Sequence, residues 1–231
     1  MAVTASRTGF LCVVSGPSGS GKTTLCRKAR ELDHCAYSIS CTTRQPRNGE
    51  VDGKDYHFLS KQEFLDRTMK GEFLEWAKVH ENFYGTLRSE VTCHLEVGTD
   101  VLMDIDVQGA ALIRACEDDF IRRSLVDIFI LPPTMEELRS RLAGRNTESE
   151  EQLRLRLYNA LEEMRHWREY QYAILSGSPD EDLARFRAIL QAERLRGRRM
   201  RTPASLLADG ARFDELPDPA GLNRQPDFFG G

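Results

Sequence analysis

The clearest chemistry in the chain lies between Gly16 and Thr23, where the sequence GPSGSGKT fits the phosphate-loop pattern G-x-x-x-x-G-K-[ST]. Glycines let consecutive backbone N–H groups converge on a phosphate, and the start of a following helix adds positive potential. Lys22 would reach the outer phosphates of a nucleoside triphosphate, and the Thr23 hydroxyl would hold Mg²⁺. The residues expected to bind the triphosphate are Gly16, Pro17, Ser18, Gly19, Ser20, Gly21, Lys22, Thr23 and Thr24.

The residues on both sides of this loop support that interpretation over an ordinary flexible Gly-Ser turn. Phe10 to Val14 is a short β-prone run, and Thr23 to Leu32 has apolar residues at helical spacing. Strand, loop and helix are the order that a phosphate loop requires. The loop does not identify a reaction, because GTPases, ATP-driven motors and small-molecule kinases all use it.

A second candidate site lies in a polar, turn-rich segment that contains Arg44, Arg47 and Tyr56. Guanidinium groups bind phosphate oxygens in pairs, and a tyrosine hydroxyl adds another donor. This combination suits a terminal monophosphate. From these residues alone, ordinary surface ion pairing remains the alternative.

Several sequence blocks resemble guanylate kinases in their order and spacing: GPSGSGKTTL, SISCTTRQPRNGEVDGKDYHF, EFLEWA, NFYGT and LMDIDVQG. The resemblance covers about Phe10 to Leu195. It implies phosphoryl transfer from ATP to GMP and dGMP, giving ADP and GDP, with Mg²⁺ accompanying ATP and no tightly bound organic cofactor. A non-catalytic binding module of the same fold and a kinase for another phosphorylated small molecule are the alternatives. The intact phosphate loop argues against the binding module.

By that resemblance, Ser40, Glu75 and Asp106 meet the guanine base, and most of the other acceptor residues hold the phosphate of GMP. Guanine presents an acceptor at O6 and donors at N1 and the 2-amino group, which a hydroxyl and two carboxylates match. For Glu75 alone, a solvated surface position is the alternative. The full set of GMP-binding residues that the resemblance implies is Ser40, Arg44, Arg47, Tyr56, Glu75, Tyr84, Gly85, Thr86 and Asp106.

The metal and the moving lid are also implied by the resemblance. Asp104 ends the apolar run Val101 to Met103, as a metal-positioning aspartate does, so Thr23 and Asp104 are expected at Mg²⁺, directly or through water. No general base is needed, because a phosphate monoester with a second pKa of about 6 is already ionised at pH 7. The expected catalytic residues are Lys22, Arg44, Arg141, Arg145 and Arg156, the last three on a flexible lid.

Two positions depart from the family pattern. Leu175-Ser176-Gly177-Ser178-Pro179 stands where the family usually has an Asn-Asp-Asp type sequence that frames the donor adenine. The preference for ATP over other triphosphates is therefore left open. Asn146 stands where the family most often has glycine, which would alter the flexibility of the lid.

The elements that must position these residues follow from apolar runs and helix starts. Val101 to Ile105, Leu125 to Leu131 and Tyr172 to Leu175 indicate strands buried on both faces. Capping boxes that begin with Ser or Thr at 60, 134, 149 and 178 indicate helices. We predict an α/β fold: a three-layer P-loop NTPase-type core with a mostly parallel sheet, a small mixed-β GMP-binding insert and a helical lid. The expected boundaries are a domain at 8–200, with its core at 8–36 and 97–200, its insert at 37–96 and its lid at about 141–157, then a disordered tail at 201–231.

Composition narrows the remaining partners. The chain has 231 residues, 40% of them hydrophobic, which is typical of a globular protein. Its net charge of −4 argues against extensive nucleic-acid binding and leaves small phosphorylated ligands open. No apolar run approaches the length of a membrane span. Six cysteines without a C-x2-C pair favour reduced thiols and a reducing cytoplasm. Together with the resemblance, we expect a monomeric or weakly dimeric protein. The arginine-rich run from Arg194 to Arg201 favours a solvated helix end, with acidic lipid, RNA or the acidic tail as alternative contacts.

Overall fold

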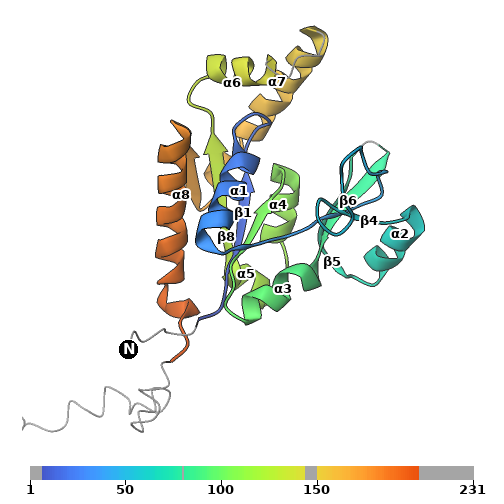
Figure 1. Cartoon of the computed structure of the whole chain (residues 1–231), viewed down its shortest axis with the longest axis vertical. Coiled ribbons are helices and arrows are strands. Elements are labelled where there is room, and N and C mark those ends of the chain that lie inside the picture. The colour runs from blue at the N-terminus through green and yellow to red at the C-terminus, as the bar shows by residue number, and fades with distance from the viewer. Residues whose placement is uncertain (1–6, 80, 144–149, 203–231) are drawn as a thin grey trace, which may run out of the picture.

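A parallel sheet of five strands lies at the centre of the molecule (Figure 1). The structure is a computed structural model and describes residues 7–79, 81–143 and 150–202. The strands stand in the order β2-β7-β1-β8-β9, and every pairing in this sheet is parallel, as expected. The strands are β1 (Leu11–Ser15), β2 (Ala36–Tyr37), β7 (Val101–Asp104), β8 (Leu125–Leu131) and β9 (Tyr172–Leu175).

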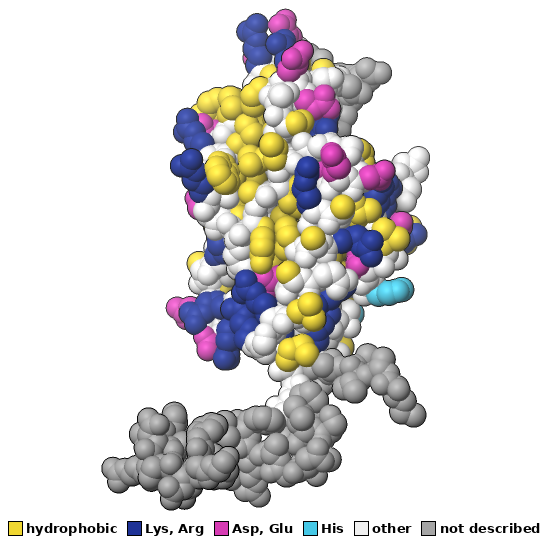
Figure 2. All heavy atoms as spheres, turned by 90° about the vertical axis from the view of Figure 1, so that its left-hand side faces the viewer, with side chains coloured by type: hydrophobic (Ala, Val, Ile, Leu, Met, Phe, Trp, Pro, Cys, Tyr) yellow, Lys and Arg dark blue, Asp and Glu magenta, His cyan; other side chains and the backbone are white. Residues whose placement is uncertain are grey.

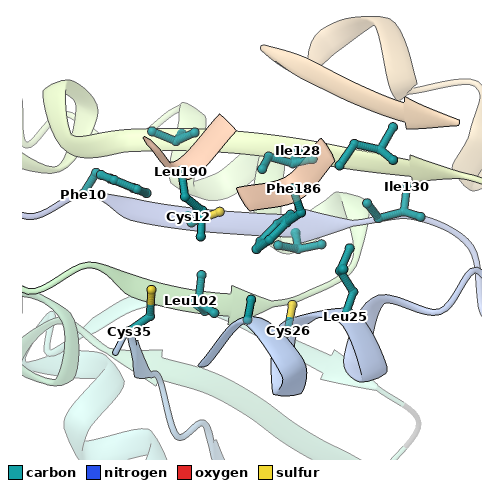
Figure 3. Close-up of a cluster of buried hydrophobic side chains, with 14 residues drawn as sticks. Phe10, Cys12, Leu25, Cys26, Cys35, Leu102, Ile128, Ile130, Phe186 and Leu190 are labelled. Carbon is teal, nitrogen blue, oxygen red and sulfur yellow. The ribbon is translucent and has the colours of Figure 1, made fainter. Parts of the chain in front are cut away.

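Helices cover both faces of this sheet because alternate side chains of each strand point to opposite faces. On one face Phe186 and Leu190 of α8, Leu25 and Cys26 of α1 and Cys12 of β1 belong to one buried cluster (Figure 3). The opposite face is covered mainly by α3, α4 and α5. These three layers confirm the predicted α/β core. Its helices are α1 (Lys22–Asp33), α3 (Arg88–Glu96), α4 (Val107–Arg114), α5 (Asp119–Ser124) and α8 (Pro179–Arg194).

A second, smaller sheet of four strands stands beside the large one (Figure 1). Its order is β4-β3-β6-β5, with β3 and β4 parallel and the other pairings antiparallel, so it is mixed. Phe64 of α2 stacks on Phe73 with a ring-centroid distance of 4.3 Å and forms a separate small core there. The elements are β3 (Cys41–Thr42), β4 (His57–Phe58), α2 (Lys61–Met69), β5 (Phe73–Val79) and β6 (Asn82–Leu87).

The helices α6 (Met135–Ala143) and α7 (Glu150–Met164) project above the end of the large sheet where the phosphate loop lies (Figure 1). They pack on each other through Leu138, Leu142 and Ala160. Because this small core is separate from the two main clusters, the pair has few apolar ties to the rest of the molecule. The expected positions Arg145 and Asn146 and the predicted cap at 149 lie outside the described residues.

Three of the predicted helix starts are present in the described residues. The Ser60 hydroxyl accepts a hydrogen bond from the backbone N–H of Glu63 at 3.1 Å and opens α2. Thr134 accepts a hydrogen bond from a backbone N–H in the first turn of α6 at 3.1 Å. Ser178 forms a reciprocal capping box at the start of α8, with proline at the next position. These local signals therefore place helices correctly without tertiary information.

The arginine-rich run at the end of α8 differs from the prediction. Arg194 donates to Asp100 at 2.7 Å, and Arg199 is only 2% exposed and pairs with Glu193 at 2.9 Å. The expectation of a fully solvated helix end is wrong for these two residues, because buried carboxylates lie beneath them. Other Lys and Arg side chains do gather on the surface around the lower end of α8 (Figure 2). The expected tail from residue 203 onward lies outside the described residues.

All six cysteines lie within the described residues, and each has a free thiol. Four of them are buried in the cores of the two sheets. In residues 7–79, 81–143 and 150–202, no helix combines the length and apolar character needed to cross a membrane.

Candidate active site

The phosphate loop connects the end of β1 to the first residue of α1. Gly16, Gly19 and Gly21 have φ angles of 148°, 85° and 97°, and a Cβ on Gly16 would lie 2.4 Å from the carbonyl oxygen of Ile130. Glycine is therefore required at these positions. No side chain caps the start of α1, so the loop leaves its N–H groups available to an anion. The Lys22 ammonium folds across the loop and donates to the Gly16 carbonyl at 2.6 Å.

Thr23 and Asp104, the two predicted metal residues, are brought together by the parallel pairing of β1 and β7. The Thr23 hydroxyl donates to Asp104 Oδ2 at 2.6 Å. A hydroxyl and a carboxylate are oxygen donors of the kind Mg²⁺ takes, so this pair fits the implied metal. Within the described residues, no three His, Cys, Asp or Glu side chains could hold a metal by themselves. Such a site suits an ion that keeps several waters and binds substrate phosphates.

One pocket, with a volume of about 320 Å³, lies between the phosphate loop and the start of α8. Arg141 contributes to its wall, and so does the segment Ser176 to Pro179, whose sequence differs from the family pattern. The Ser176 hydroxyl and the Gly177 N–H both donate to the Asp182 carboxylate, at 2.7 and 2.8 Å. These bonds fix the segment against α8, so its shape does not depend on an Asn-Asp-Asp sequence.

A second pocket, of about 260 Å³, lies between the small sheet and the start of α4. Among the described residues, none that lines this pocket belongs to the phosphate loop, and the pocket reaches the central sheet at the carboxyl end of β7. Asp106 caps α4 by accepting a hydrogen bond from the Gly109 N–H at 2.8 Å. Six of the predicted acceptor residues line this pocket: Ser40, Tyr56, Glu75, Tyr84, Gly85 and Asp106.

Glu75 is the most buried carboxylate in this pocket, with 8% of the residue exposed. It accepts a hydrogen bond from the Thr86 hydroxyl at 2.8 Å, and the Ser40 hydroxyl lies 3.3 Å from that of Thr86. Burial raises the pKa of Glu75 to about 7, against the lowering effect of the Thr86 hydrogen bond, and the nearby Asp106 charge raises it further. Glu75 is therefore a buried acceptor and not a solvated surface residue.

The predicted phosphate clamp lies beside this pocket, in the loop between β3 and β4. Arg44 pairs with both carboxylate oxygens of Glu50, at 2.8 and 2.9 Å, and its guanidinium lies 5.4 Å from the centre of the Tyr56 ring. The same carboxylate accepts the backbone N–H of Arg47 at 2.7 Å. Glu50 was not predicted from the sequence. Its position three residues after Arg47, in a turn, was the signal that could have indicated a carboxylate partner for these arginines. The arginines hold the pKa of Glu50 at about 2, chiefly through the Arg44 hydrogen bond.

Two of the arginines that were predicted to lie on a lid approach the phosphate loop, one from α6 and one from α7. Arg156 donates to the Ser18 hydroxyl at 3.0 Å, which joins α7 to the loop. Arg141 lines the cavities on the loop and pairs with Glu137 one turn earlier at 2.8 Å. Two of the three predicted lid arginines are therefore at the loop, and the third, Arg145, lies outside the described residues.

Glu163 also faces the site and was not predicted. It is half-buried and lines a cavity of about 250 Å³ together with Lys22, Thr23, Asp104 and Asp106. Burial raises the pKa of Glu163, Lys22 opposes that shift and Asp106 adds to it. In the sequence it follows another glutamate in an amphipathic helix, which is the pattern of a solvated face.

A phosphate loop at the end of the central strand, with one pocket on the loop and a second, polar pocket at the end of β7 beside the small sheet, defines a class of protein. It is the arrangement of P-loop kinases that act on small phosphorylated substrates, with both ligands at the carboxyl edge of the sheet. The sequence comparisons identify the family within this class.

The sequence profile of the family described as guanylate kinase matches residues 9–193. A guanylate kinase of Paramagnetospirillum magneticum is 48% identical over 197 residues, covering 85% of this chain and 90% of that protein. One of Clostridium tetani is 40% identical over 210 residues, covering 91% and 99%. The crystal structure of guanylate kinase from Anaplasma phagocytophilum has a TM-score of 0.68 and 34% identity, covering 90% of this chain and 97% of that chain.

The chain belongs to the guanylate kinase family, and the resemblance seen in the sequence motifs is confirmed. It is an enzyme of that family, a nucleotide-binding kinase with the P-loop fold.

Proposed function

We propose that the protein transfers the terminal phosphoryl group of ATP to GMP, and to dGMP, giving ADP and GDP. The observation that carries this proposal is the buried polar chain Glu75, Thr86 and Ser40 at the acceptor pocket, beside Asp106. An ionised Glu75 would accept from the guanine N1–H and 2-amino groups, and the Ser40 hydroxyl would serve O6. Adenine would present a lone pair to Glu75 and leave a buried carboxylate unpaired, which is costly.

The acceptor phosphate would be held at the other end of the pocket by Tyr56 and Tyr84, with Arg44 and Arg47 beside them. The bidentate bond to Glu50 holds the Arg44 guanidinium beside the Tyr56 ring, which orients its remaining donors. Gly85 supports the fit, because a Cβ there would lie 2.8 Å from the Glu75 carbonyl oxygen.

The donor triphosphate would lie on the N–H groups of the phosphate loop, from Gly16 to Thr24. The Lys22 ammonium would exchange its hydrogen bonds to two loop carbonyls for contacts with the outer phosphates of ATP. Thr23 and Asp104 would hold Mg²⁺, which supplies charge neutralisation at the transferred phosphoryl group. We further propose that the segment 141–157 closes as a lid, so that Arg141, Arg145 and Arg156 stabilise the developing charge.

On this proposal the partners are the two nucleotides, without nucleic acid or membrane, and the protein acts in the cytoplasm as a monomer or weak dimer. The slightly acidic charge of −4 supports small-molecule partners over nucleic acid, and the free thiols of the six cysteines support the cytoplasm.

The experiment that tests the proposal is an assay of the purified protein with ATP and Mg²⁺ against GMP, dGMP, AMP, CMP, UMP and ribose 5-phosphate. We expect diphosphate formation with GMP and dGMP only. Lys22→Ala, purified in parallel, controls for a contaminating kinase and should lose about 10² or more in rate. GMP binding without turnover would favour a binding module, and turnover of the sugar phosphate would favour a different kinase.

A further inference from the structure

The lid helix α7 meets the active site at two points on one side of the helix. Arg156 contacts Ser18 of the phosphate loop at 3.0 Å, and Glu163 reaches the cavity beside Lys22 from the last turn of the helix. Seven residues separate Arg156 from Glu163, which is close to two helical turns, so both side chains leave α7 on the same side. A carboxylate is thus carried into a region that must receive phosphates.

The charges around that cavity are unusual for a phosphate site. Three carboxylates, those of Asp104, Asp106 and Glu163, line it with a single ammonium group, that of Lys22. The ammonium is already bonded to loop carbonyls, at 2.6 and 3.2 Å. Within the described part of the chain, the Glu163 carboxylate has no hydrogen-bond donor. A half-buried carboxylate without a donor, next to incoming phosphates, is unfavourable unless a cation lies between them.

The donor set indicates which cation this is and how it is held. The cavity offers carboxylate oxygens and the Thr23 hydroxyl, all oxygen donors of the kind that Mg²⁺ and Mn²⁺ bind. Because no three acidic side chains of the described residues are placed to hold a metal directly, the ion would keep its waters on this side. Carboxylates that accept hydrogen bonds from such waters orient the metal without touching it.

We propose that Glu163 is a positioning residue for the metal: it accepts a hydrogen bond from a water on the Mg²⁺ of bound ATP and so couples the lid helix α7 to the metal. This inference rests on the proposed function, because it requires a metal-bound triphosphate on the phosphate loop. Arg156 then contacts the loop and Glu163 the metal, so that α7 is held over the donor only when both nucleotide and metal are present.

A direct test measures the affinity for ATP by calorimetry, once with excess Mg²⁺ and once with EDTA, without GMP. For the wild-type protein we expect Mg²⁺ to tighten ATP binding. In Glu163→Gln this tightening should fall about tenfold, the usual effect of losing a partner of a metal-bound group. The affinity in EDTA should stay equal or become tighter, because a negative charge near Lys22 is removed. Mn²⁺ binding to the ATP complex, followed by electron paramagnetic resonance, should weaken in parallel.

Glu162→Gln is the matched control, because Glu162 is adjacent on the same helix but pairs with Arg165 at 3.2 Å and does not line the cavity. It should leave both ATP affinities within twofold of wild type. GMP affinity and the thermal midpoint should be unchanged in both variants, and Glu163→Ala should reproduce the metal effect if glutamine alters the fold.

Two results would overturn the proposal. One is that Mg²⁺ tightens ATP binding as much in Glu163→Gln as in the wild-type protein. If ATP also binds more tightly to this variant in EDTA, Glu163 is only a counter-ion for Lys22. The other is an equal loss of ATP affinity with and without metal, which would make its role purely structural. Failure of the proposed function is distinguishable, because it would appear as absent GMP turnover in the wild-type protein, whatever the metal effect.

Discussion

Glu75 shows how one residue would link nucleotide choice to pH. Its environment raises its pKa to about 7, chiefly by burial, and only the ionised form accepts both guanine donors. In the folded protein the carboxyl binds its proton more tightly than in the unfolded chain, where the pKa is 4.5. Its contribution to folding stability is therefore present below pH 4.5 and is lost as the pH rises through about 7.

For ligand binding the sign is opposite. We predict that GMP affinity falls roughly tenfold between pH 8 and pH 6, because protons compete for the carboxylate that guanine needs. Calorimetric titration across this range measures it. Glu75→Gln should bind GMP more weakly at pH 8, lose this part of the pH dependence and discriminate less against other monophosphates. The ionisation of the GMP phosphate affects both proteins equally, so a dependence that persists unchanged in the variant would remove Glu75 from the base site.

At the scale of elements, the start of α8 builds one wall of the donor pocket. Asp182, 9% exposed, accepts hydrogen bonds from Ser176 and Gly177 and so holds the strand-to-helix connection against the helix. The reciprocal cap at Ser178 fixes the same turn from its other side. The pocket wall is thus set by backbone and short polar side chains.

We predict that Asp182→Ala raises the KM for ATP several-fold and leaves the KM for GMP unchanged, because the buried Ser176 hydroxyl and the Gly177 N–H lose their acceptor and the wall shifts. Steady-state kinetics with each substrate varied separately measure the split. Asp180→Ala is the control, since the Asp180 side chain is 96% exposed on the same helical turn. Equal changes in both KM values would show that the turn matters to the whole site and not to the donor pocket.

At the scale of the whole molecule, the end of α8 and the residues directly after it are tied to the core by buried ion pairs. Arg199 pairs with Glu193, which also accepts a hydrogen bond from Tyr172 at 2.6 Å, so the segment after α8 is joined to β9. Burial alone would raise the pKa of Glu193, but these hydrogen bonds hold it below its ordinary value. Arg194 and Arg7 both donate hydrogen bonds to the carboxylate of Asp100, the residue directly before β7.

We predict that Arg199→Ala lowers the free energy of unfolding by about 3 kcal/mol or more, because it leaves a fully buried glutamate without its main partner. Urea denaturation measures this. Arg198→Ala, at an exposed neighbouring position, should change the unfolding free energy by less than about 0.5 kcal/mol. If both variants behave alike, the pair is not a stabilising contact of the fold. Because the ionised Glu193 is stabilised in the folded state, part of this stability should be lost as the pH falls below its ordinary range.

The sequence by itself determined the features that depend on local pattern. The phosphate loop, the buried strands and the caps at Ser60, Thr134 and Ser178 are encoded within a few residues, because turns and caps are made by neighbours in the chain. The mostly parallel core and the mixed small sheet were also predicted, since alternating strands and helices allow few arrangements. The acceptor residues were predicted through the family resemblance, and the structure gathers six of them around one pocket.

Only the tertiary structure decided which charged groups are buried and which are solvated. Glu163 has the local pattern of a surface glutamate, yet the packing of α7 against the phosphate loop turns it into the active-site cavity. Arg194 has the pattern of a solvated helix end, yet Asp100, which is 94 positions away in the chain, draws it into an ion pair. Charge partners of this kind are set by three-dimensional distance and local dielectric, neither of which a linear pattern contains.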